Sequence, residues 1–306
     1  MVEAIHLSSE VEAALRDRRP VVALESTLIT HGLPWPDNAA TALAMEAAVR
    51  GSGAVPATIA VLAGRITVGL SPAHIEDLAQ RPLGAVRKCS RRDLPIVVAR
   101  GEDGATTVAG TMIVAHQAGI RVFGTGGIGG VHRGAPFDVS ADLIELGRTR
   151  VTVVCAGPKA ILDLPLTLEV LETHGVPVIG LGSDTLPGFY TRSTGLPIDA
   201  RVDTPREAAG IIAAAERLDA GHGVLVVVPV PASEEPADGV DAAIERAVGE
   251  AADAGVRGKA LTPFLLERVA ALTGGASMRA NRALLLNNAR VAGLIAVELA
   301  SLRAQR

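Results

Sequence analysis

Short, almost wholly apolar runs, bounded by glycine, proline or charged residues, most limit how this chain can fold. Val151-Thr-Val-Val-Cys155 is the clearest of them, since it presents no polar face to water. A strand of that kind must be covered on both sides, as strands of parallel sheets are. Runs that predict strands lie at 20–27, 57–62, 122–125, 151–155, 176–181 and 223–231, and 64–69 is expected to form a hairpin with 57–62.

Helical stretches, many of them rich in alanine, separate these runs. They are predicted at 8–19, 37–50, from 71 onward, 106–119, 140–147, 205–218, 238–254, 262–273 and 278–302. Strands that alternate with helices predict an α/β fold, here an α/β/α layered arrangement with a largely parallel sheet and helices on both faces. A length of 306 residues suits one large domain, so we expect a single domain over 1–306.

Composition excludes several classes of function. No apolar run approaches the roughly 18 residues of a membrane helix, and Glu3 and Glu10 interrupt the start where a leader would be apolar. We therefore expect a soluble, cytoplasmic protein without a membrane partner. Cys89 and Cys155 alone make no disulfide framework or zinc motif. A net charge of −4, with one Trp, one Tyr and four Phe, argues against nucleic-acid binding.

A glycine tract after the 122–125 run has the composition of a binding site. Gly124-Thr-Gly-Gly-Ile-Gly-Gly130 leads into His132, Arg133, Asp138 and Asp142. Glycine lets backbone N–H groups approach an anion, and the charged residues can bind phosphate or a hard cation. The segment from Val86 to Pro95 adds four cations and Ser90, which suit either a solvated face or a phosphate pocket.

Two residues have the chemistry of catalysts. Glu25 ends a predicted buried strand, at the end where open α/β sheets bind ligands. Only three of the 29 cationic residues are lysine, namely Lys88, Lys159 and Lys259, so a lysine here is more often needed as an amine. Lys159 follows a buried strand and is expected at a helix N-terminus, where burial and the helix dipole disfavour the ammonium form.

The motifs fit three classes of function to different degrees. Gly124 to Gly129 fits the G-x-G-x-x-G pattern of dinucleotide-binding oxidoreductases, but Gly130, Gly134 and Pro136 would break the helix that this motif requires. A noncatalytic regulator that binds a sugar phosphate has no DNA- or partner-binding segment to support it. An enzyme that forms a Schiff base with a sugar phosphate fits better, with Lys159 as the amine and Glu25 as acid and base.

Several longer strings resemble the pseudouridine-5'-phosphate glycosidase family, from about residue 8 to 300. They are Val-Val-Ala-Leu-Glu25-Ser-Thr, Lys88-Cys-Ser-Arg-Arg-Asp-Leu-Pro, Gly104-Ala-Thr-Thr-Val-Ala, Gly124-Thr-Gly-Gly-Ile-Gly-Gly-Val-His-Arg-Gly, Phe137-Asp-Val-Ser-Ala-Asp-Leu, Val-Cys-Ala-Gly-Pro-Lys159, Thr262-Pro-Phe-Leu-Leu and Asn287-Asn288-Ala. The resemblance implies a homotrimeric α/β/α enzyme that reversibly splits pseudouridine 5'-phosphate into uracil and ribose 5-phosphate, with one divalent ion per subunit, usually Mn²⁺, with Mg²⁺ or a similar ion as the alternative.

The resemblance also implies roles for individual residues. Glu25 matches the proton donor, Lys159 the covalent nucleophile and Asp138 the metal ligand. The positions that match substrate-binding residues are Lys88, Val108, Ser140, Ala141 and Asp142, with Thr125, His132 and one of Asn287 or Asn288 as weaker matches. A C-glycoside has no leaving-group heteroatom to protonate, so the two carboxylates of ordinary glycosidases would not suffice and an amine is needed.

Overall fold

The computed structural model describes residues 5–82, 84–236, 239–256 and 261–305, so Lys259 lies outside the described residues. Its centre is an eleven-stranded sheet in which nine strands follow the order β1-β4-β3-β2-β7-β10-β14-β12-β13, with β6 paired to β3 and β5 to β6. The strands are β1 (Ile5–Leu7), β2 (Val21–Leu24), β3 (Val55–Leu62), β4 (Arg65–Val68), β5 (Arg87–Cys89), β6 (Gly104–Thr106), β7 (Val122–Gly124), β10 (Thr152–Cys155), β12 (Val178–Leu181), β13 (Ala200–Val202) and β14 (Leu225–Val227).

The sheet is largely parallel, as the apolar runs predict. Strands β3, β2, β7, β10, β14, β12 and β13 pair in parallel, whereas β4 and β6 run antiparallel to β3. The predicted hairpin is confirmed: Ala63 and Gly64 join β3 to β4 with φ of 47° and 77°. Positive φ at both central residues is typical of the tight turns that follow strand twist.

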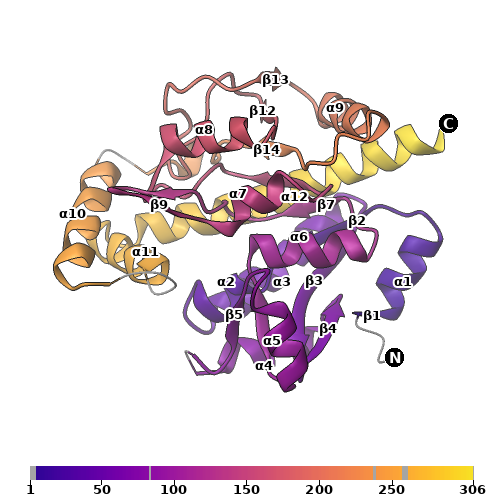
Figure 1. The fold of residues 1–306 in the computed structure, drawn as a ribbon, viewed down its shortest axis with the longest axis horizontal. Helices are drawn as coiled ribbons and strands as arrows, with labels where there is room; N and C mark the ends of the chain where they lie inside the picture. Colours follow the sequence, from indigo (N-terminus) through magenta and orange to yellow (C-terminus); the bar gives the residue numbers. More distant parts are fainter. Residues whose placement is uncertain (1–4, 83, 237–238, 257–260, 306) are drawn as a thin grey trace.

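Helices cover both faces of the sheet (Figure 1). They are α1 (Ser9–Arg16), α2 (Thr27–His31), α3 (Asp37–Gly51), α4 (Pro72–Gln80), α5 (Leu94–Arg100), α6 (Val108–Gln117), α7 (Ala141–Leu146), α8 (Leu164–Thr173), α9 (Pro205–Arg217), α10 (Val240–Asp253), α11 (Leu261–Leu272) and α12 (Ala276–Ala304). Helices α3, α9 and α12 pack together on one face, and α1, α6, α7 and α8 pack on the other.

Each central strand contributes to two separate cores. Val22 and Leu24 of β2 face the core under α3, α9 and α12, whereas Val21 and Ala23 face the core under α1 and α6. All of β2 is buried, which explains why this strand has apolar residues at consecutive positions. The two-residue period of a strand sends neighbours to opposite faces, and a sheet covered on both sides therefore needs apolar residues at every position.

Helix α12 is the longest helix of the described chain and crosses the molecule from α11 to the C-terminus (Figure 1). An 18-residue window within it has a mean hydropathy of 1.4, so its length and composition alone would let it cross a membrane. It packs against β2, β7 and β10 and between α3 and α9. Its apolar residues thus belong to the interior of the α/β fold, as do those of any buried core helix.

The glycine tract leads into a small second sheet, which the sequence did not predict. Strands β8 (Val131–His132), β9 (Ala135–Val139) and β11 (Leu162–Asp163) pair antiparallel in the order β11-β8-β9. The next helix, α7, begins only at Ala141. A dinucleotide-binding motif needs a helix directly after its first glycines, so this geometry contradicts the oxidoreductase hypothesis.

Candidate active site

A cavity of about 510 Å³ opens where β2 and β10 end, at the carboxyl side of the sheet. Residues predicted as catalytic, metal-binding or substrate-binding from the sequence converge on its wall: Glu25, Lys88, Val108, His132, Asp138, Ser140, Ala141, Asp142 and Lys159. They come from segments as far apart in the sequence as the end of β2 and the loop after β10. The carboxyl ends of parallel strands share one edge of the sheet, which is why such distant residues meet.

Glu25 and Thr125 are neighbours because β2 and β7 pair in parallel with Leu24 opposite Gly124. The Thr125 hydroxyl donates a hydrogen bond to Oε1 of Glu25. Glu25 is 9% exposed, and this burial raises the pKa of its carboxyl group, although Lys159 and the Thr125 hydrogen bond oppose the rise. Burial therefore favours a Glu25 that retains its proton and can act as an acid.

Thr125 and Asn288 form the support behind Glu25 and do not line the cavity. The amide Nδ2 of Asn288 donates to the carbonyl oxygens of Thr125 at 2.9 Å and Gly126 at 3.3 Å. Asn288 is fully buried, whereas the Oδ1 of Asn287 accepts a hydrogen bond from Arg290 at the surface. Of the two adjacent asparagines, Asn288 thus contacts the backbone at the start of the glycine tract and holds it in place.

Lys159 lies in a loop that is tied to the glycine tract. Its backbone N–H donates to the carbonyl oxygen of Ile128 at 3.1 Å, and the N–H of Ile128 donates to Gly157 at 3.1 Å. The expected position at a helix N-terminus is wrong, because β11 intervenes and α8 begins only at Leu164. The amine of Lys159 makes no ion pair with the described residues, yet its charge acts on both Glu25 and His132.

The glycines serve close packing more than direct contact with an anion. A Cβ at Gly127 would lie 2.7 Å from the ring of Phe189 and 2.8 Å from the carbonyl oxygen of Gly157. The N–H of Gly129 is already bonded, because it donates to Oδ2 of Asp142 at 2.9 Å. The tract therefore lets three segments meet under the cavity, which is a role that only a residue without a side chain can fill.

Asp142 joins the two helices that border the cavity. Its Oδ1 accepts from the N–H of Ala109 in α6 at 2.9 Å, while its Oδ2 accepts from Gly129. Ser140 caps α7, since its Oγ accepts from the N–H of Asp142 at 3.2 Å. The first turns of α6 and α7 line the cavity, and the N-terminal end of a helix favours an anion.

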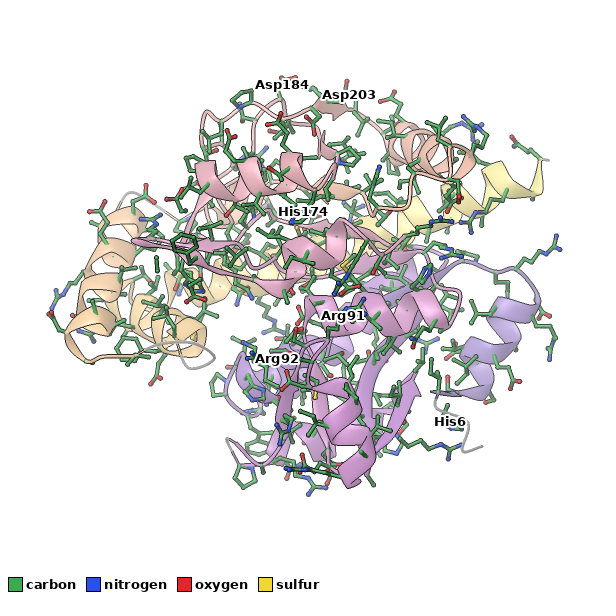
Figure 2. All side chains as sticks on the ribbon, viewed as in Figure 1. His6, Arg91, Arg92, His174, Asp184 and Asp203 are labelled. Carbon is green, nitrogen blue, oxygen red and sulfur yellow. The ribbon has the colours of Figure 1, made fainter. Side chains whose placement is uncertain are left out.

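Arginines and Lys88 gather beside these helix ends. Arg91 and Arg92, labelled in Figure 2, line the cavity together with Ser90 and Arg148. Nε and Nη2 of Arg91 donate to the two oxygens of Glu145 at 2.8 and 2.6 Å. Glu145 has no exposed surface; its burial opposes ionisation, but hydrogen bonds from Arg91 and Thr149 lower its pKa overall. The cluster of cations at 87–92 was the sequence signal for this basic corner.

Asp138 offers a single exposed carboxylate at the mouth of the cavity. It lies on β9. Burial of His132 lowers the pKa of that imidazole, and the negative charge of Asp138 opposes this shift. Within the described part of the chain, no three His, Cys, Asp or Glu side chains come together as a metal cage. A cation held here would keep most of its water ligands, which suits Mg²⁺ and Mn²⁺ better than a soft metal.

The fold and the site define a family. The model of the family described as indigoidine synthase A like protein matches residues 10–298, and the chain belongs to this family. Solved structures agree: the crystal structure of the prealnumycin C-glycosynthase AlnA in complex with ribulose 5-phosphate superposes with a TM-score of 0.91, at 41% identity, covering 100% of both chains. An indigoidine synthase A like protein from Thermotoga maritima gives 0.88 at 35% identity, covering 97% of this chain and 96% of that one.

Several curated relatives of this chain are named for one enzymatic activity. A protein of Rhodospirillum centenum named pseudouridine-5'-phosphate glycosidase is 60% identical over 307 residues, covering 99% of this chain and 95% of the relative. Relatives with the same name from Hahella chejuensis and Paracoccus denitrificans are 54% and 55% identical, covering 95% and 98% of this chain and 97% and 100% of theirs. The resemblance inferred from the motifs is thus confirmed over nearly the whole chain.

Proposed function

We propose that this chain reversibly cleaves the C–C glycosidic bond of pseudouridine 5'-phosphate to uracil and ribose 5-phosphate. The observation that carries the proposal is the meeting of a buried Glu25 and the amine of Lys159 in one cavity with a cationic corner. Relatives at 54–60% identity are named for this activity, and a structural neighbour is a C-glycosynthase bound to a sugar phosphate. The substrate class is therefore a sugar phosphate or nucleotide.

The chemistry follows from the two catalytic groups. The C1'–O4' bond breaks as protonated Glu25 gives its proton to the ring oxygen, and the nitrogen of Lys159 forms a bond to C1'. The ammonium formed on Lys159 returns a proton to Glu25, and the nitrogen lone pair then forms a C=N bond while the C1'–C5 bond to uracil breaks and C5 takes that proton from Glu25. Water adds to the protonated imine and gives a proton to Glu25, and collapse of the adduct releases ribose 5-phosphate and restores the amine. The net reaction consumes one water.

The basic corner of the cavity would bind the phosphate of the substrate. Lys88, Arg91 and Arg92 would pair with the phosphate, and the N–H groups at Val108 and Ala141 would complete its contacts. This corner lies beside the residues that hold Glu25 and Lys159, so the phosphate would anchor the ribose while its C1' reaches the amine. Binding energy from a group that does not react can position the one that does.

A divalent ion, Mn²⁺ or Mg²⁺, is part of the proposal. Asp138 would hold it with water as the remaining ligands, and the ion would supply positive charge at the cavity mouth. The homotrimer remains a prediction that rests on the resemblance, and the cytoplasmic location remains a prediction that rests on composition. A solution mass of three times the 31.3 kDa chain would support the trimer, and a monomer mass would contradict it.

Trapping tests the amine mechanism directly. Ribose 5-phosphate and borohydride should leave a reduced adduct on Lys159, located by peptide mass spectrometry. The variant Lys88→Arg, which keeps the charge of the other cavity lysine but removes its amine, should still be labelled, whereas Lys159→Arg should not. Labelling at Lys88 instead would contradict the role of Lys159, and no labelling of the wild type would contradict the imine. Chromatography of pseudouridine 5'-phosphate formed from uracil and ribose 5-phosphate tests the overall activity separately.

A further inference from the structure

A second cavity lies at the opposite edge of the sheet. It has a volume of about 550 Å³ and is enclosed by the turn after α1, the turn before β7 and the last turns of α12. Val21 and Val122, the first residues of β2 and β7, form part of its wall. The active-site cavity lies at the other end of these strands, so the two cavities share no lining residue.

This cavity is cationic on one side and apolar on the other. Arg18, Arg19, Arg121 and Arg303 line it, and none of the acidic residues that the structure describes does. The apolar wall includes Leu15, Ile120 and Leu299. A space of this size is typical of small-molecule sites, which combine an apolar surface with a few polar groups that fix orientation.

The charge at Arg121 is not balanced within the described chain. Arg121 is partly buried and makes no ion pair there; its guanidinium instead contacts Nδ1 of His116 at 2.8 Å. Burial lowers the pKa of Arg121; Glu216 opposes this, while Arg303 and Arg150 add to it. Glu216 is itself bonded to Arg303. Arg121 does not sit at a helix C-terminus, where a cation would offset the helix dipole, because it directly precedes strand β7.

Arg18 adds an independent observation. It has φ of 54°, the left-handed conformation that favours glycine. It occupies the position after the α1 cap, where the N–H of Arg18 donates to Leu15 and that of Arg19 to Ala14. Glycine is the usual residue at this point of such a helix end. Non-glycine residues in this conformation are uncommon and occur more often at functional sites.

We propose that this cavity binds a nucleoside monophosphate, with its phosphate on the arginines and its base against the apolar wall. The planar guanidinium fork of arginine can donate two parallel hydrogen bonds to a pair of phosphate oxygens. Arg18, Arg19 and Arg121 line the cavity from two separate turns, and the apolar wall offers the base a surface away from water.

Adenosine 5'-monophosphate is a suitable probe, because its N-linked base makes it no substrate for C–C cleavage. Isothermal titration of the full chain should show one site per chain, with adenosine at least about 10-fold weaker. The double variant R18Q/R19Q should weaken binding by about 10-fold or more. The control Arg16→Gln removes an exposed arginine that pairs only with Asp17 among the described residues, and it should change affinity less than about twofold.

Two further variants separate this site from the active site and from a structural role. Lys88→Gln, at the active-site cavity, should leave binding of the probe unchanged. Arg18→Gly should raise the thermal midpoint, because glycine accepts the left-handed backbone, and should weaken binding. The proposal is overturned if the probe does not bind, if adenosine binds equally well, or if Lys88→Gln rather than R18Q/R19Q removes binding.

Discussion

Replacing Gly129 by alanine tests how the glycine tract serves the site. The new Cβ would lie 2.6 Å from Cβ of Ser140 and 2.9 Å from Oδ2 of Asp142, and would also meet the Ser140 hydroxyl. Ordinary contact needs about 3.5–4 Å, so the start of α7 must move by about 1 Å. Overpacking of this kind costs about 1–3 kcal/mol.

The displaced residues line the cavity, so we expect a functional loss larger than the loss of stability. A shift of about 1 Å in a positioning element can reduce kcat/KM by about 100-fold, whereas the thermal midpoint should fall by only about 2–6 °C. Gly210→Ala is the matched control: Gly210 lies in α9 with no atom near the added Cβ, so it should be as stable as the wild type or more so. Unchanged kcat/KM in Gly129→Ala would refute the reasoning.

Three further predictions concern charged groups. Glu145→Gln should destabilise the chain by about 2–3 kcal/mol at pH 7, measured by denaturant unfolding. Because the pKa of Glu145 is lowered in the folded state, the difference from the wild type should shrink as the pH falls through that pKa. A difference that does not change with pH would contradict the charge pair. Thr125→Val removes a hydrogen bond that lowers the pKa of Glu25, so the alkaline limb of the kcat/KM profile should move to higher pH; an unmoved limb would argue against Glu25 as the acid. Asp138→Asn should weaken activation by Mn²⁺, and unchanged metal dependence would count against its role as a ligand.

The central strands could be predicted because burial on both faces leaves a visible pattern. The runs at 122–125 and 151–155 contain β7 and β10, whereas the run at 20–27 extends beyond β2, since α2 begins at Thr27. Strands β5 and β6 are too short to show a period, and β8 has only two residues. Their positions depend on pairing with distant segments, which no local pattern records.

In the site, too, residue types and motifs could be predicted from the sequence, whereas contacts between distant segments could not. Glu25, Lys159 and Asp138 could be named from their residue types and motifs, and all line one cavity. The bond between Arg91 and Glu145 joins residues 54 apart in sequence, and nothing in either segment indicates it. The choice of Asn288 over Asn287 likewise depends on which side of α12 faces the sheet, which is set by packing against β7 and β10.

Helix α12 serves both cavities. Asn288 holds the backbone behind Glu25, and Leu299 lines the arginine-rich cavity about 16 Å further along the same helix. A packed helix moves as a rod, so a displacement along its axis at one end reaches the other. Any preference of a ligand in one cavity for a particular position of α12 would then change affinity in the other cavity, and by the same factor in both directions.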